Sequence, residues 1–159
     1  MALNKIDNIG GGINEQPRKM VGQVPTMTGY NTPSGVVTDS GCLSSYYGWK
    51  VFDNDSSSFW HTPVRQSLTN EFVQYEFSNK TKISMVKVKP YSGTYQGITI
   101  YGSNDGVNYT SLYSDSDSHN AEEFFAIPNS EYKMYKIQIE GSHYNDGYYT
   151  RIAEIQLYQ

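Results

Sequence analysis

Alternation of hydrophobic and polar residues is the clearest pattern in the second half of the chain. Residues 72–77 place Val73, Tyr75 and Phe77 on one face, with Gln74 and Glu76 between them. A period of two is typical of a β-strand that packs one face against a core. Similar alternation, or short β-branched and aromatic runs, predicts further strands at 83–88, 98–101, 109–113, 123–127, 135–139 and 152–158.

Turn-forming residues separate these segments, as in the sequence GSNDG at 102–106. No window of helical length keeps an apolar stripe at helical spacing. Short strands divided by Gly, Asn, Asp and Ser turns favour an antiparallel sandwich or barrel. We therefore predict an all-β fold, an antiparallel β-sandwich of about eight strands.

The beginning of the chain has a different composition. Residues 1–24 contain three consecutive glycines at 10–12 and no periodic apolar face, so we expect an extended Gly-rich arm there. Residues 25–159 have the length of one domain and show no internal repeat. The sequence thus predicts an arm followed by a single β-sandwich domain.

Charge and hydropathy argue against several classes of partner. The chain has 12 Lys and Arg against 16 Asp and Glu, a formal net charge of -4, and no basic cluster. Nucleic acids and anionic lipids both require a basic face, so we expect neither as a partner. No apolar run approaches the ~20 residues of a membrane span, and residues 1–16 lack the apolar centre of a secretory signal. We expect no membrane insertion.

Catalysis is also not expected. The three histidines are His61, His119 and His143, and none belongs to a motif that sets a nucleophile beside a base. The single cysteine, Cys42, cannot form an internal disulfide, and we expect it to be a small, partly buried residue. We predict a binding protein and not an enzyme.

The stretch 49–62 concentrates oxygen-bearing groups in a loop closed by aromatic residues. Asp53, Asp55 and three serines lie within six positions. Hard oxygen ligands at this density suit Ca²⁺. The alternative is that the two aspartates cap a turn through bonds from backbone amides to their carboxylates.

The same stretch, WKVFDNDSSSFWHT, resembles the signature loop of discoidin domains, also called coagulation factor 5/8 C-type domains, and of family 32 carbohydrate-binding modules. Three other segments resemble family motifs in the same order: FVQYEF at 72–77, YGSNDGVNY at 101–109 and IAEIQLY at 152–158. The resemblance covers residues from about 25 to 158. It implies a jelly-roll, galactose-binding-like sandwich and a non-catalytic binding role.

The resemblance also implies a structural Ca²⁺ between the signature loop and the last strand. A Glu154 without a partner at the end of an apolar strand would be costly to bury, and an ion shared with Asp53 would neutralise both carboxylates. The implied ligands are the carbonyls of Lys50, Asp55 and Ala153 and the side chains of Asp53, Ser58 and Glu154.

Sugar recognition is expected at loops on one end of the sandwich. His61 matches in position a family histidine that contacts sugar, whereas Tyr91 stands where the family has an arginine. The loop 141–149 combines stacking faces with directional polar groups, but it also reads as a hairpin turn whose tyrosines pack across strands. The candidate ligand-binding residues are His61, Arg65, Tyr91, Tyr95, His143, Tyr144, Asn145 and Tyr148.

Two functions fit these expectations. The first is a module that binds a glycan or polysaccharide on a cell surface. The second is a structural appendage of a phage particle that docks to other virion proteins through residues 1–22. The segment 24–37 resembles the opening segment of discoidin modules in bacteriophage tail and virion proteins. We expect a virion or extracellular location, and a homo-oligomer or array, because weak single-site glycan binding gains from multivalency.

Overall fold

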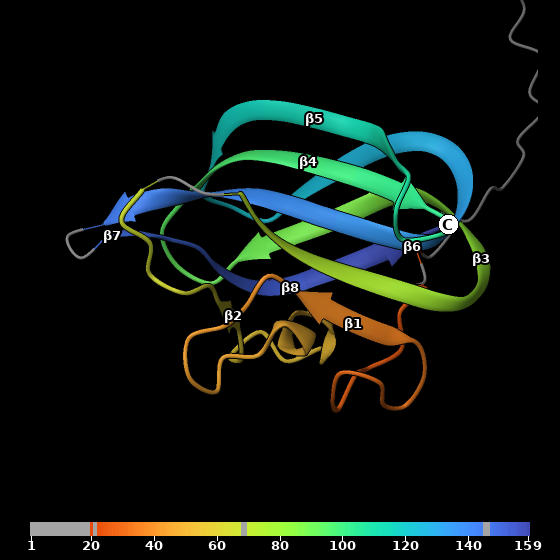
Figure 1. Cartoon of the computed structure of the whole chain (residues 1–159), viewed down its shortest axis with the longest axis horizontal. Helices are drawn as coiled ribbons and strands as arrows, with labels where there is room; N and C mark the ends of the chain where they lie inside the picture. Colours follow the sequence, from red (N-terminus) through yellow and green to blue (C-terminus); the bar gives the residue numbers. More distant parts are fainter. Residues whose placement is uncertain (1–19, 21, 68–69, 145–146) are drawn as a thin grey trace, which may run out of the picture.

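The computed structural model describes residues 20, 22–67, 70–144 and 147–159. Its described part contains eight β-strands and one short 3₁₀ helix (Figure 1). The elements are β1 (Val36–Asp39), η1 (Gly48–Phe52), β2 (Trp60–His61), β3 (Asn70–Pro90), β4 (Tyr95–Ser103), β5 (Tyr109–His119), β6 (Glu123–Tyr144), β7 (Gly147–Tyr149) and β8 (Arg151–Tyr158).

The strands pair antiparallel in the order β2-β8-β3-β6-β4-β5, with β1 added to β3 and β7 added to β6. All neighbours in this arrangement run in opposite directions. The predicted all-β antiparallel sandwich of about eight strands is confirmed.

Two strands are much longer than the alternation indicated. The segments 72–77 and 83–88 were expected as separate strands, but both lie within β3, and β6 likewise contains 123–127 and 135–139. The β3–β6 ladder shifts register between Glu76 and Thr81 and again between Ile83 and Met85. Extra residues at such irregularities bend a strand without ending its pairing. Both strands therefore curve at one end of the molecule (Figure 1).

Several tyrosines belong to the core. Tyr75 and Tyr135 are buried among the aliphatic residues of β3, β4, β6 and β8. Their hydroxyls still find partners: Tyr75 donates to the Ser34 carbonyl and Tyr135 to the Thr81 carbonyl, each at 2.7 Å. A buried tyrosine combines a large apolar contact with one satisfied hydroxyl, which explains part of the high tyrosine content.

The end of the segment expected as an arm lies against the sandwich. Gly22 forms a bridge with Tyr158, and the Gln23 amide donates to the Leu157 carbonyl at 2.7 Å. Val24 is buried in the core. The domain therefore begins before residue 25, the predicted boundary. Residues 1–19 and 21 lie outside the described residues.

Helix η1 sets the path of the signature loop. Val51 and Phe52 are buried, and the helix packs against β8. Asp39 at the end of β1 fixes the approach to η1, because its carboxylate accepts from the Gly41 amide at 2.8 Å and the Gly48 amide at 2.9 Å. In the part of the chain that the structure describes, no helix has the length and apolarity needed to cross a membrane.

Candidate functional site

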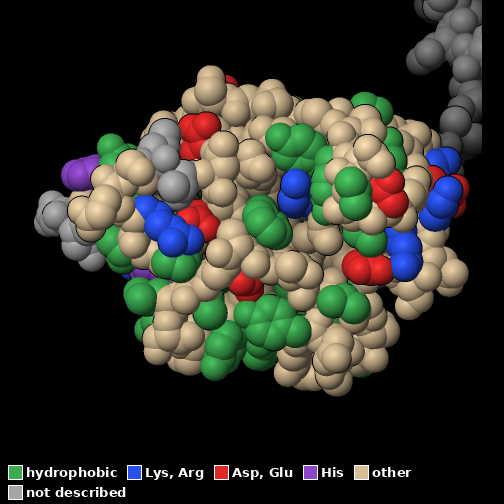
Figure 2. All heavy atoms as spheres, in the orientation of Figure 1, with side chains coloured by type: hydrophobic (Ala, Val, Ile, Leu, Met, Phe, Trp, Pro, Cys, Tyr) green, Lys and Arg blue, Asp and Glu red, His purple; other side chains and the backbone are tan. Residues whose placement is uncertain are grey.

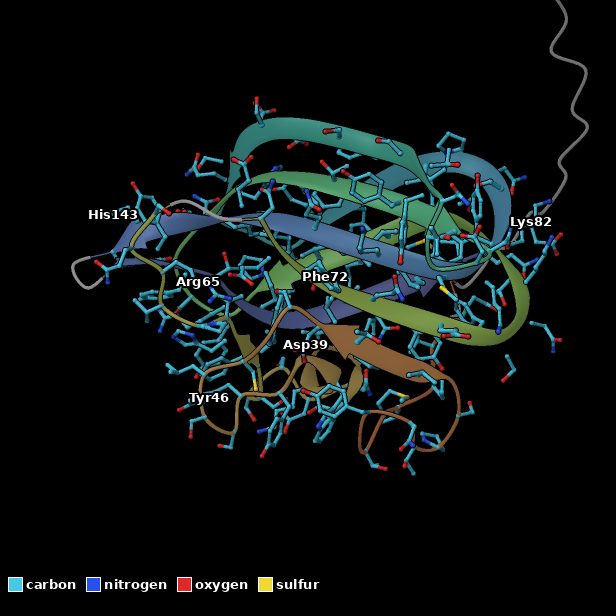
Figure 3. All side chains as sticks on the ribbon, in the orientation of Figure 1. Asp39, Tyr46, Arg65, Phe72, Lys82 and His143 are labelled. Carbon is cyan, nitrogen blue, oxygen red and sulfur yellow. The ribbon has the colours of Figure 1, made fainter. Side chains whose placement is uncertain are left out.

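The signature loop, the end of β3 and the β6–β7–β8 turn region meet at one end of the sandwich (Figure 1). Figure 3 labels Tyr46, Arg65 and His143, which come from three distant segments and lie toward this end. Figure 2 shows hydrophobic, basic and histidine side chains close together there. Arg65 and His143, two of the residues predicted to contact a sugar, lie toward this end.

A stack of three aromatic rings forms the first part of the site. Phe59 lies between Tyr91 and Tyr46, with ring centroids 3.8 Å and 4.6 Å away and interplanar angles of 21° in both pairs. Tyr91 is 42% exposed and Tyr46 is 37% exposed. Rings held on one side and open on the other offer flat apolar surface to a ligand.

A second stack continues from the first. His61 lies 6.5 Å from Phe59 and stacks on Tyr149 at 4.7 Å, and Tyr149 stacks on Tyr144 at 4.2 Å. We call the six residues of the two stacks the aromatic strip. Its members are Tyr46, Phe59, His61, Tyr91, Tyr144 and Tyr149.

Arg151 supplies a cation beside the strip. Its guanidinium carbon lies 5.3 Å from the ring centre of Tyr149 and 5.7 Å from that of Tyr144. Its main chain is directly opposite His61 in the β2–β8 pair, and its carbonyl accepts from the Tyr91 amide at 3.0 Å. A guanidinium over aromatic faces is a favourable cation–π arrangement.

The sequence interpretation missed Arg151, Tyr149 and Phe59. It looked for an arginine near Tyr91 and found none, whereas the structure brings one from β8. In the structure Thr150 is buried, so alternation along the chain places Tyr149 and Arg151 together on the opposite side. The Thr150 amide donates to the Thr62 hydroxyl at 2.9 Å, which fixes this register.

Tyr144 and His61 are held by hydrogen bonds. The Tyr144 hydroxyl accepts from the Thr94 amide and donates to the Thr94 carbonyl, both at 3.2 Å. His61 Nδ1 lies 2.6 Å from the Thr62 carbonyl oxygen. Because a carbonyl only accepts, Nδ1 carries the proton in this bond. Both rings are therefore oriented before any ligand arrives.

Tyr95 does not belong to the ligand surface, and its prediction as a sugar contact is wrong. The residue is 0% exposed and stacks on His119 with centroids 4.8 Å apart. Burial raises the pKa of Tyr95 well above its ordinary value, and the nearby carboxylates of Glu123 and Asp115 add to the effect. Its position in β4 turns the ring into the sandwich, where no glycan reaches it.

The remaining candidates lie next to the strip. Arg65 donates from Nε to Glu71 at 2.7 Å and exchanges two backbone bonds of 2.9 Å with Tyr148. His143 is exposed and packs edge-on against Tyr148 at 4.9 Å. Tyr144 and Gly147 pair directly across β6 and β7. Asn145 lies outside the described residues.

The signature loop brings several oxygen atoms close together. Ser58 Oγ lies 2.5 Å from Asp53 Oδ2 and 3.5 Å from the Lys50 carbonyl oxygen. The Asp55 carbonyl accepts from the Ser58 amide at 3.0 Å. These loop oxygens are of the kind that a hard cation prefers.

The turn-capping alternative is also present in this loop. Asp53 Oδ1 accepts from the Asp55 amide, and Asp55 Oδ1 accepts from the Ser57 amide, each at 2.9 Å. Hydrogen bonds from the Ser57 hydroxyl and amide lower the pKa of Asp55. The two aspartates therefore stabilise the loop's own backbone.

Glu154 does not lack a partner, contrary to the expectation. Its carboxylate lies 3.1 Å from the Lys87 ammonium and accepts from Gln156 Nε2 at 3.4 Å. Burial disfavours the charged form of Lys87, but Glu154 outweighs it and raises the pKa of the lysine. Among the described residues, no three His, Cys, Asp or Glu side chains gather in a metal-binding group. The loop oxygens fit a cation, whereas the strand carboxylate is already neutralised by an ammonium.

Comparisons with known proteins agree on the fold. The family model described as F5/8 type C domain matches residues 37–155. No curated protein matches the sequence. Among solved structures, chitosan-binding module 1 of a chitosanase/glucanase from Paenibacillus sp. IK-5 has a TM-score of 0.72 at 15% identity, covering 87% of this chain and 99% of that one.

Two further similar structures are carbohydrate-binding modules with bound sugars. A CBM32 module from Clostridium perfringens in complex with GalNAc-β-1,3-galactose has a TM-score of 0.66 at 14% identity, covering 79% of this chain and 95% of that one. The CBM32 of AlyQ in complex with 4,5-unsaturated mannuronic acid has a TM-score of 0.63 at 17% identity, covering 77% and 92%. At these identities the likeness shows the fold alone. Because the family model spans most of the chain, this protein belongs to the F5/8 type C domain family and has the discoidin-like fold of the CBM32 modules.

Proposed function

We propose that this protein is a non-catalytic carbohydrate-binding module and that its glycan contacts the aromatic strip. The observation that carries the proposal is a pair of adjacent ring stacks, joined by tilted contacts of His61 with Tyr46 and Phe59, with Tyr91 and Tyr46 exposed in one stack and Arg151 beside the other. A sugar ring presents C–H groups on its faces and hydroxyls at its edge. Aromatic faces with a few polar groups around them match both.

Rigidity supports the proposal as well. Phe59 supports the Tyr91 ring from behind at 3.8 Å, and the Tyr144 hydroxyl is fixed by two bonds to Thr94. A site that is ordered in advance loses less entropy when the ligand binds. This matters for glycans, whose single contacts are weak.

The similar structures support a carbohydrate ligand. Their names refer to chitosan binding, to a bound GalNAc-β-1,3-galactose and to a bound unsaturated mannuronic acid. The ligands differ while the fold is shared, so the loop residues of this chain decide its own ligand. One similar chain joins its CBM32 to an alginate lyase domain.

A glycan array tests the proposal directly. We expect the full chain to bind at least one glycan class and Tyr91→Ala to lose that signal, because truncation of a ring that stacks on the ligand costs about 1–3 kcal/mol. Phe124→Ala is the matched control, since Phe124 is also an exposed aromatic residue, at 48%, but lies on β6 next to Tyr158. A wild-type array without any hit, or a hit lost equally in both variants, would contradict the proposal.

We also propose a structural Ca²⁺ in the signature loop. The oxygens of Lys50, Asp53, Asp55 and Ser58 would hold it, together with Ala153 and Glu154 on β8 if the carboxylate leaves Lys87. The convergence of Ser58 Oγ on Asp53 and Lys50 supports the loop half of this site. The ion would connect the loop to the last strand and so stabilise the fold.

The biological setting stays a prediction. We propose a cell-surface glycan as the ligand, a virion or extracellular location, and presentation in an oligomer or larger assembly that raises avidity. The docking role predicted for residues 1–22 falls almost entirely outside the described residues. Deleting residues 1–19 tests it: incorporation into a particle should fail while glycan binding by the sandwich persists.

A further inference from the structure

We propose that the site selects anionic glycans and that Arg151 is the residue that recognises the negative group. The ligand class is a sugar that carries a carboxylate or a sulfate. This inference rests on the proposed carbohydrate-binding function and adds the chemistry of the ligand to it.

The first observation is that Arg151, among the described residues, has neither a hydrogen bond on Nε nor a carboxylate partner. Its Nε atom is buried and makes no hydrogen bond, and no carboxylate of the described residues forms an ion pair with it. Buried polar atoms are almost always hydrogen-bonded, and an unpaired one costs free energy. Because Nε itself is closed to solvent, an acceptor on a ligand would meet the other N–H groups of the guanidinium.

The second observation is the contrast with other partly buried cations. Arg65 is bonded to Glu71, Lys87 to Glu154, and Lys133 to Glu76 at 2.8 Å. Each of these three charges is neutralised inside the protein, whereas Lys136, which lies over the rings of Phe72, Tyr101 and Tyr109, forms no ion pair with the described residues. At the end of the sandwich that holds the aromatic strip, Arg65 is neutralised by Glu71, and Arg151 forms no ion pair with the described residues.

The third observation is the position of the guanidinium. It lies over the rings of Tyr144 and Tyr149, and its strand position is directly opposite His61. The rings limit the orientations of the side chain. A planar fork of N–H groups held in this way matches the two oxygens of a carboxylate or sulfate. A sugar stacked on the strip would bring its acidic substituent to this fork.

The negative net charge of the chain bears on how an anionic ligand could bind. The chain has a net charge of -4, so an anionic polysaccharide is repelled by most of its surface. Beside the aromatic strip, the guanidinium of Arg151 would offset this repulsion.

Calorimetry on the full chain with matched pairs of oligosaccharides tests the proposal. One pair is oligogalacturonate and its methyl ester, and the second is a sulfated galactan oligomer and its desulfated form. We expect the acidic member of at least one pair to bind at least about tenfold more tightly, as charge-assisted hydrogen bonds require. The pair that shows the difference identifies carboxylate or sulfate as the recognised group.

Two substitutions then assign the effect. Arg151→Met keeps the length of the side chain and should reduce the preference for the acidic member to less than about threefold, whereas Arg151→Lys should retain part of it. Lys133→Met removes a charge that pairs with Glu76 and should leave the preference unchanged. Melting temperatures report whether each variant is folded. If Arg151→Met does not fold, the preference for the acidic member is compared between Arg151→Lys and the wild type.

The outcomes separate this inference from the proposed function. Equal binding of both members of every pair, or a preference that survives in Arg151→Met, would overturn the inference and leave carbohydrate binding intact. A wild-type protein that binds no member of either pair but binds neutral glycans would also overturn it. A protein that binds no glycan of any kind would overturn both.

Discussion

His61 on β2 lies directly opposite Arg151 on β8, and this pair joins the signature loop to the last strand. The two residues are 90 positions apart in the sequence, since they are numbered 61 and 151. Tyr149 extends the relationship, because its ring stacks on His61 and lies under the Arg151 guanidinium. The proposed site is thus built on backbone pairing within the sheet.

Tyr149 is predicted to be the ring on which the second stack depends. Tyr149→Ala removes its contacts to His61, Tyr144 and Arg151, so we expect glycan affinity to fall at least about tenfold and the free energy of unfolding to drop by about 1–3 kcal/mol. Tyr149→Phe keeps the ring and should retain most of both. Calorimetric titration and thermal unfolding measure the two effects. Loss of binding in Tyr149→Phe as large as in Tyr149→Ala would contradict the stacking account.

Calcium is predicted to stabilise the protein through the signature loop. Adding Ca²⁺ at millimolar concentration should raise the melting temperature, and Asp53→Ala should abolish the increase because it removes the loop carboxylate. A rise of the same size in Asp53→Ala would exclude this loop as the site.

Lys87 should compete with that calcium. In Lys87→Met the Glu154 carboxylate no longer has its ammonium partner at 3.1 Å, so we expect tighter Ca²⁺ binding than in the wild type. Lys89→Met is the control, because Lys89 lies opposite Glu154 in the β3–β8 pair whereas the ion pair of Glu154 is with Lys87. If Ca²⁺ affinity is unchanged or weaker in Lys87→Met, Glu154 does not ligate the ion.

A buried histidine predicts a pH-dependent stability. His119 lies 2.9 Å from Asp115 and 3.1 Å from Glu123, in the layer where Tyr95 and Tyr113 also pack. Burial disfavours its charged form, but the two carboxylates outweigh burial and raise the pKa of His119. Because the folded pKa exceeds the unfolded one, the stabilisation is complete below about pH 6.5 and is lost as the pH rises through the folded pKa.

Thermal unfolding between about pH 5 and 9 measures this effect. Wild-type stability should decline with rising pH more steeply than that of His119→Gln, which cannot carry the charge. The pKa of Asp115 is lowered, despite its burial, by hydrogen bonds from Tyr113 and His119. The stability that Asp115 contributes is therefore lost only at acid pH. Parallel pH profiles for the two proteins would show that His119 is not the cause.

Gly93 is predicted to be required for the position of Tyr144. Its φ is +79°, and a Cβ at this position would lie 2.0 Å from the Tyr144 hydroxyl. Gly93→Ala should therefore strain the turn, break the bonds to Thr94 and lower the free energy of unfolding by about 1–2 kcal/mol. Gly29→Ala, where a Cβ would meet no atom closer than 3.8 Å, is the control in thermal unfolding. Equal stability of the two variants would contradict this assignment.

Much of the fold follows from local patterns. Alternation in 72–77 and 152–158 predicted strands, and the four ordered motifs indicated the family that the model of residues 37–155 shows. The length of β3 did not follow, because Ser78, Asn79 and Lys80 resemble a turn while the strand bends through them and keeps its pairing on either side. Such a bend depends on the neighbouring strand and not on local preference.

The site was predictable only where a single segment carries it. His61, Tyr91 and Tyr144 were identified from their own loops, and the structure places all three in one strip. Tyr95 was misplaced, since burial of a tyrosine in a strand depends on register and not on residue type. Arg151 was missed because its role arises from pairing across β2 and β8.

The most direct measurement of the central claim is an NMR titration of the full chain with a glycan identified on the array. Chemical-shift changes should concentrate on the aromatic strip and on Arg151. The residues of β5 around Thr110 should keep their chemical shifts. Changes centred on a different face of the sandwich, or no change at any glycan concentration, would contradict the assignment of this end as the carbohydrate-binding site.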